Sequence, residues 1–115
     1  MSDALIKLLA GLGASGWDFR IASFDGDSLT LAAGTSRDHA RPLVVFSGVS
    51  YLDCPTVFSL AAFSVASDSE RDSVRKLVPL DPEDVVIQIE AETQAGLGTR
   101  HFRIVATAAH RVTAP

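Results

Sequence analysis

The most reactive side chain type in the sequence occurs once, at Cys54. It stands between Asp53 and Pro55, a composition typical of a loop. A thiolate here could act as a nucleophile if a histidine approached it. The carboxylate of Asp53 is expected to raise the thiol pKa, which disfavours the thiolate. We therefore interpret Cys54 as a small hydrophobic residue and keep it as a candidate pocket residue.

The three histidines are too dispersed to predict a metal site. His39 falls in a polar segment expected to form a loop. His101 and His110 are nine residues apart on what should be one strand, and an odd separation points them to opposite faces. Paired cysteines and H-E-x-x-H spacings do not occur. The sequence therefore predicts neither a metal nor catalytic residues within one segment.

Two short motifs match enzyme patterns in letters only. Residues 11–16 read G-x-G-x-x-G, but a dinucleotide site needs a strand before this motif and a helix after it. The sequence predicts a helix before this motif and a strand after it. Residues 73–76 read S-x-x-K, but the chain has no asparagine for the accompanying Ser-Asp-Asn element. We predict no cofactor.

Glu90 and Glu92 share one face of an expected strand, about 7 Å apart. That separation is similar to the spacing of paired catalytic carboxylates. Because Arg100 and Arg103 follow closely in the sequence, we favour a salt-bridged surface over an acid–base pair.

The first segment offers the clearest candidate interaction surface. Four leucines recur at helical spacing up to Leu12, and Ile6 widens the apolar surface beyond one narrow stripe. We expect this helix to pack on a sheet, with Leu5 and Leu8 available to a partner or a second copy. Trp17 and Tyr51 are further candidates, as binding residues if exposed and as core residues if buried.

Alternating apolar and polar residues, and one almost unbroken apolar run at residues 43–49, predict the strands that would position these side chains. The expected strands cover residues 19–23, 29–33, 43–49, 56–66, 85–92 and 102–108. Asp25-Gly26 predicts a type I′ turn between the first two. Residues 56–66 also fit a helix, but their Val and Phe content favours a strand. Ser67 and Glu70 predict a capping box that opens a short helix over residues 67–78.

These elements predict one α+β domain over residues 1–115. We expect a single, mostly antiparallel sheet of about six strands, either flat or curved into an open barrel. The N-terminal helix should pack on this sheet, and one short helix should precede the last hairpin.

Charge and cysteine content limit the partners and the compartment. The net charge is −4 and no run of basic residues exceeds two, which disfavours nucleic acid and anionic membranes. One cysteine favours a reducing, cytoplasmic location. The apolar stretch at residues 4–12 is too short to span a bilayer and lacks a preceding positive region. Eight arginines, two lysines and no asparagine suggest a GC-rich bacterial genome.

Three functions fit these observations. The first is a non-catalytic binding or assembly module, as a homodimer or with another protein. The second is a small-ligand-binding protein or minor enzyme with a pocket between helix and sheet, lined by Cys54, Tyr51 and Trp17. The third is a toxin-neutralising, immunity-type protein, suggested by acidic charge and small size.

Overall fold

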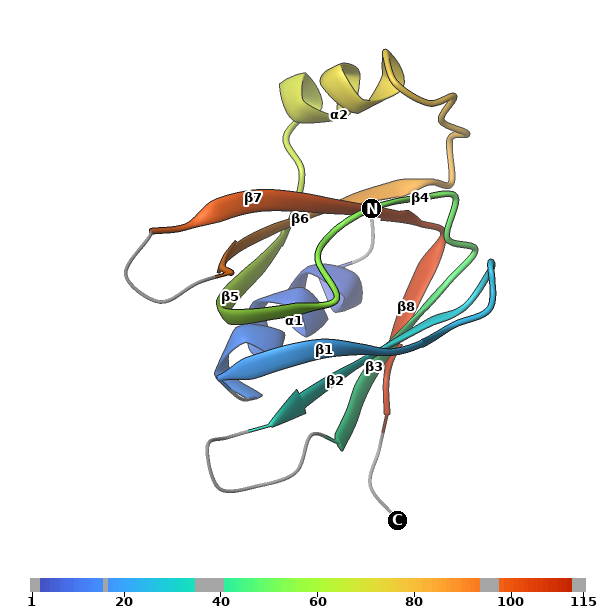
Figure 1. Cartoon of the computed structure of the whole chain (residues 1–115). Coiled ribbons are helices and arrows are strands. Elements are labelled where there is room, and N and C mark those ends of the chain that lie inside the picture. Colours follow the sequence, from blue (N-terminus) through green and yellow to red (C-terminus); the bar gives the residue numbers. More distant parts are fainter. Residues whose placement is uncertain (1–2, 16, 35–40, 94–97, 113–115) are drawn as a thin grey trace.

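The computed structural model describes residues 3–15, 17–34, 41–93 and 98–112 (Figure 1). Within them the chain forms two α-helices, one 3₁₀ turn and eight strands. The elements in chain order are α1 (Asp3–Leu12), η1 (Gly13–Ser15), β1 (Asp18–Phe24), β2 (Leu29–Gly34), β3 (Arg41–Ser47), β4 (Tyr51–Asp53), β5 (Val57–Val65), α2 (Asp68–Arg75), β6 (Val85–Glu92), β7 (Arg100–Ala106) and β8 (Ala108–Arg111).

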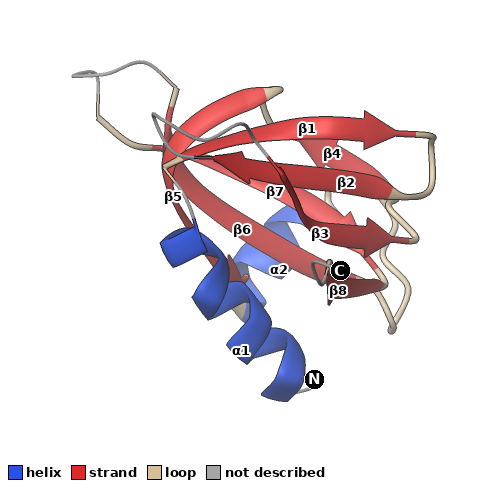
Figure 2. Cartoon of the chain, turned by 90° about the horizontal axis from the view of Figure 1, so that it is seen from below, coloured by secondary structure: helices blue, strands red, loops and turns tan. Residues whose placement is uncertain are grey.

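The strands form one open antiparallel sheet in the order β4-β7-β6-β5-β1-β2-β3-β8. The sheet is strongly curved, with β1, β2 and β3 on one side of the curve and β6 and β7 on the other (Figure 2). The predicted fold class is therefore confirmed, including the helix that packs on the sheet and the helix before the last hairpin. The expected number of about six strands is wrong, because the sheet has eight.

The two additional strands arise where extended segments turn a corner. Gly48 has a φ of +65° and separates β3 from β4, while Thr107 separates β7 from β8. The two corners face each other, because the Thr107 N–H donates to the Ser47 carbonyl at 2.9 Å. On one side of the corner β3 pairs with β8, and on the other β4 pairs with β7. Strand β4 lies beyond the strand predicted at residues 43–49, and β8 begins at the last residue of the strand predicted at residues 102–108.

Strand β5 links the two sides of the curve. Residues 57–59 pair with β1, and residues 62–65 pair with β6. Leu60 lies between these stretches with a φ of +52°, a conformation unusual for a residue with a Cβ. Residues 56–66 are therefore a strand, as predicted, with a bulge at the bend.

The first predicted turn differs from the expectation. Four residues, 25–28, separate β1 from β2, and Gly26 has a positive φ while Asp25 does not. The Asp25 carboxylate accepts hydrogen bonds from the backbone N–H groups of Asp27 and Ser28, at 2.9 and 2.7 Å. These bonds lower the pKa of Asp25, the one from Ser28 most. The type I′ prediction is wrong because this side chain organises a longer turn.

The main core lies between α1 and the curved sheet. Leu9 and Leu12 of α1 are fully buried in it, and Phe19 stacks on Phe58 with ring centroids 5.6 Å apart. Gly13 permits the close approach of η1 to β5, since a Cβ there would lie 2.5 Å from the Ala61 carbonyl oxygen. The N-terminal helix is thus fixed to the sheet by its C-terminal half.

Helix α2 covers a second, smaller apolar cluster outside the main core. Its one buried residue, Val74, packs on Val86 and Val105. The predicted capping box is confirmed, with the Ser67 hydroxyl accepting from the Glu70 N–H and the Glu70 carboxylate accepting from the Ser67 N–H. Hydrogen bonds from Ser67 lower the pKa of Glu70.

Candidate functional site

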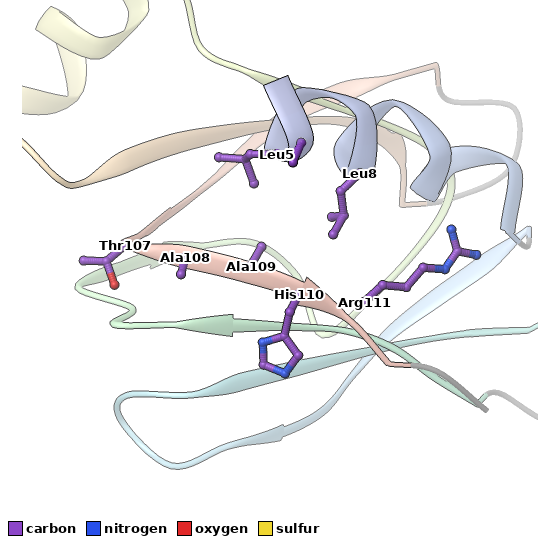
Figure 3. A pocket seen from close by; sticks show the side chains of 8 residues that line it. Leu5, Leu8, Thr107, Ala108, Ala109, His110 and Arg111 are labelled. Carbon is purple, nitrogen blue, oxygen red and sulfur yellow. The ribbon is translucent and has the colours of Figure 1, made fainter. Parts of the chain in front are cut away.

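A cavity of about 380 Å³ separates the N-terminal half of α1 from strand β8 (Figure 3). Its walls are mostly apolar. The residues that line it are Ala4, Leu5, Leu8, Thr107, Ala108, Ala109, His110 and Arg111. The first helix and the last strand, far apart in the sequence, therefore form one groove.

The helical wall consists of leucines that the core leaves partly uncovered. Leu9 and Leu12 point into the core, whereas Leu5 and Leu8 are only partly buried and extend from α1 toward β8 (Figure 3). Ile6, on the outer side of the helix, is 48% exposed and does not line the cavity. The wide apolar surface seen in the sequence is thus divided between core, groove and solvent.

The other wall is an edge strand. Strand β8 pairs with β3 on one side and ends the sheet order. The Val112 N–H donates to the Leu43 carbonyl at 2.9 Å, so His110, two residues earlier, also directs its backbone groups toward β3. Ala109, the residue before His110, therefore directs its N–H and C=O away from β3. This groove therefore combines apolar side chains with outward backbone hydrogen-bonding groups.

The two ends of the groove differ in charge. At one end the Arg111 side chain reaches back toward the last turn of α1, and its Nη1 lies 3.9 Å from the position of a Cβ on Gly11 (Figure 3). At the other end Leu5 lies above the first half of β8, near Ala108 and Ala109 (Figure 3). A cation thus marks one end, whereas the residues that line the other end are uncharged.

Trp17, one of the two aromatic residues that the sequence offers as binding candidates, does not line this groove. Its side chain is 62% exposed, which places it among possible binding residues rather than core residues. The Trp17 carbonyl accepts from the Leu60 N–H at 2.9 Å, and the Leu60 side chain is also 60% exposed. The exposed side chains of Trp17 and Leu60 therefore lie on hydrogen-bonded neighbouring segments at the bend of β5.

Tyr51 and Cys54 lie near the opposite edge of the sheet. Tyr51 is half-buried against the cluster under α2, and Cys54 is half-buried against the main core. Burial and, to a smaller extent, the charge of Asp53 raise the pKa of the Cys54 thiol to about 12. The direction expected from Asp53 is confirmed, although burial is the larger cause. The thiolate needed for nucleophilic chemistry is thus disfavoured at neutral pH.

The remaining polar candidates lie on the sheet surface near α2. Gln88 Nε2 and His101 Nδ1 are 3.3 Å apart, and Glu90 lies opposite His101 in the β6–β7 register. Arg103, expected beside the glutamates, lies opposite Gln88 instead. The histidines His101 and His110 occupy different strands, β7 and β8, rather than one. His39 falls outside the described residues.

A second cavity, of about 390 Å³, lies beside the loop between α2 and β6. Arg71 lines this cavity, and its guanidinium donates to the carbonyls of Asp81 and Asp84. The Asp84 carboxylate in turn accepts from the Asp81 N–H at 2.8 Å. These bonds hold the loop against α2, so this cavity is bounded by a structural clamp.

Sequence reasoning identified one wall of the α1–β8 groove and missed the other. Leu5 and Leu8 stood out by helical spacing, whereas residues 107–111 carry only the end of an alternating pattern. No local signal marks the corner, because Thr107 continues the alternation between Ala106 and Ala108. The glycine-rich segment behaves as predicted: helix α1 comes before it and strand β1 after it, although Gly16 itself is not described.

Over the parts of the chain that the structure describes, no three His, Cys, Asp or Glu side chains are grouped to hold a metal ion. Neither helix in those parts has the length and apolarity needed to cross a membrane. Comparison with known proteins finds no family model, no curated protein and no solved structure that matches this chain.

Proposed function

We propose that the protein is a non-catalytic binding module that holds an extended polypeptide segment in the groove between α1 and β8. The observation that carries this proposal is the cavity of about 380 Å³ between partly uncovered leucines and a sheet edge. Extended segments bind to other proteins by adding a strand to such an edge, while their side chains enter neighbouring apolar pockets.

Charge and chemistry in the groove support binding over catalysis. Its walls are built from Ala, Leu and Thr, with His110 and Arg111 as its ionisable groups. In Figure 3 the His110 imidazole points to the side of β8 away from α1, so the space between helix and strand is lined mostly by apolar groups, with Arg111 at one end. Such a lining favours shape and hydrogen-bond recognition of a strand.

The test is a native mass spectrum of the protein purified gently from its own cells, combined with hydrogen exchange. We expect a bound polypeptide, either another protein or a second copy, and slowed exchange of the Ala109 amide in the complex. Leu5→Gln should remove the complex, because it places an amide in the apolar wall. Ile6→Gln, on the outer side of the same helix, is the control and should retain it.

Equal loss in both variants, or a complex that leaves Ala109 exchange unchanged, would contradict the groove as the binding site. In that case the exposed pair Trp17 and Leu60 would be the next surface to examine, by Trp17→Ala in the same experiment.

A small apolar molecule is a second candidate occupant, since the cavity volume falls in the range of about 300–1,000 Å³ typical of ligand pockets. A reproducible small added mass, lost in Leu5→Gln, would favour it. Bacterial origin, a cytoplasmic location and the toxin-neutralising role remain proposals that rest on composition and charge.

A further inference from the structure

We infer that residues 67–84, which comprise α2 and the loop after it, form a lid that opens as one unit from strands β6 and β7. The lid lies on the other side of these strands from α1 (Figure 1), so this inference is independent of the groove at β8. Opening of the lid exposes the small apolar cluster of Val74, Val86 and Val105 while the main core stays intact.

The hydrogen bonds of the lid close on the lid itself. The capping box satisfies the start of the helix, and Arg71 donates to the carbonyls of Asp81 and Asp84 at the end of the loop. Among the described residues, every hydrogen bond made by residues 67–84 has both partners inside that range. The lid can therefore leave the sheet without breaking a hydrogen bond to it.

The two ends of the lid meet the sheet at neighbouring points. Just before the lid, the Ala66 N–H donates to the Val86 carbonyl at 2.9 Å. Just after it, Val85 begins β6 and pairs with Ala106 of β7. Changes of backbone torsion at these two ends are thus enough to move everything between them.

The apolar contact between lid and sheet is small. Val74 is the lid residue that is fully buried in the cluster, and Val78 and Leu80 pack against it only partly buried. Leu77, next to them in sequence, is 61% exposed. Because stabilisation by burial scales with the apolar area removed from water, this contact holds the lid less firmly than the main core holds its strands. The lid should therefore open more often than the whole chain unfolds.

The closed lid also lies near polar atoms that have no partner. Gln88 and Arg103 are opposite each other on β6 and β7, and their buried Oε1 and Nε atoms have no hydrogen-bond partner among the described residues. The pKa of Glu70 on the lid is lowered by hydrogen bonds with Ser67 and, to a smaller extent, by the charges of Arg103 and His101. Unpaired buried polar atoms are costly, so water that enters as the lid opens offsets part of the cost of opening.

The experiment measures how fast a thiol under the lid reacts with a thiol reagent in the native protein. Val105→Cys places the thiol beneath the lid, and Val44→Cys is the matched control in the main core, since both valines are 0% exposed. Both variants carry Cys54→Ala, which leaves one thiol in each chain. We expect Val105→Cys to react at least about a hundredfold faster than Val44→Cys, because only the lid has to open.

Urea separates opening of the lid from unfolding of the whole chain. Low urea should change the reaction rate of Val105→Cys little, since opening exposes little surface, whereas the rate of Val44→Cys should rise steeply. If Val105→Cys fails to fold, Val74→Cys tests the same opening from the lid side, because Val74 is also fully buried. Equal reaction rates under the lid and in the core, or the same urea dependence at both, would overturn the inference.

Discussion

The two helices lie on the same sheet but relate to it in opposite ways. Helix α2 buries one apolar residue, Val74, over a cluster on the outer surface, and its N-terminus is closed by the Ser67–Glu70 capping box. Helix α1 buries Leu9 and Leu12 in the main core, and leaves leucines beside a cavity at its other end.

The contacts of α2 are satisfied by neighbouring residues, whereas the apolar contacts of α1 are incomplete. Around α2, side chains satisfy the backbone at the helix start, and Arg71 holds the following loop. Around α1, the apolar surface exceeds what the chain itself covers. This partly uncovered apolar surface is the reason for proposing a binding site at α1.

The largest effect should come from truncating the core side of α1. Leu9→Ala removes a fully buried side chain and should lower the free energy of unfolding by about 2–5 kcal/mol. Leu5→Ala, beside the cavity, should cost about 1 kcal/mol or less, because its side chain is already partly exposed. Chemical denaturation measures both. Equal losses would mean that the groove is part of the core.

The next effect tests the corner that separates the surface under α2 from the groove. Gly48→Ala places a Cβ at a φ of +65° and 2.3 Å from Thr107 Oγ1. Strained backbone and overpacking together should cost about 2–4 kcal/mol. In a Thr107→Ala background the same substitution should cost less, since the closest atoms are gone. Unfolding of all four proteins gives the coupling, and additive losses would show that backbone strain alone acts.

The pH dependence of the protein's stability tests the burial of Cys54 beside the β4 edge of the sheet. In the folded chain the pKa of Cys54 is raised to about 12, so the fold holds a proton that an unfolded thiol loses near pH 9. Stability should therefore fall as pH rises from about 9 toward 12, by at most about 1.4 kcal/mol per pH unit. Cys54→Ala should remove this part of the slope.

Native Cys54 should also resist a thiol reagent at pH 8, whereas the unfolded protein reacts. Rapid modification of the native protein would show that the β4 edge opens, and would remove the contrast with β8.

The smallest effect concerns the local closure of α2. Ser67→Ala removes the capping hydroxyl and should cost about 1 kcal/mol. The matched control is Ser73→Ala, since Ser73 lies exposed within the same helix and bonds only to the preceding Ser69 carbonyl. Thermal unfolding compares them. A loss in Ser73→Ala as large as in Ser67→Ala would contradict the cap as the source.

The sequence predicted most of the fold because most elements carry a local signal. The six predicted strands correspond to β1, β2, β3, β5, β6 and β7, and both helices were expected. Strands β4 and β8 were missed, because each is a short continuation of a longer strand past a corner. A corner of this kind depends on Gly48 meeting Thr107, and that contact between distant residues leaves no mark in either local pattern.

The candidate site was half predictable for the same reason. Leu5 and Leu8 were chosen as interaction residues from their helical spacing alone. The strand that faces them was not, because Ala108 and Ala109 become an edge only through the pairing of β8 with β3. The direction of the Cys54 pKa shift was predicted correctly from its neighbour Asp53. The burial of Cys54, which is the larger cause, could be seen only in the folded structure.

The groove has one wall in the first helix and the other in the last strand, so it exists only when both ends of the described chain have docked on the sheet. A chain that has formed α1 but not yet docked β8 presents the same leucines without the strand edge. Whatever binds there would therefore distinguish the finished chain from a partly folded one. Binding would act as a check on the completion of folding, and assembly would be withheld from incomplete chains.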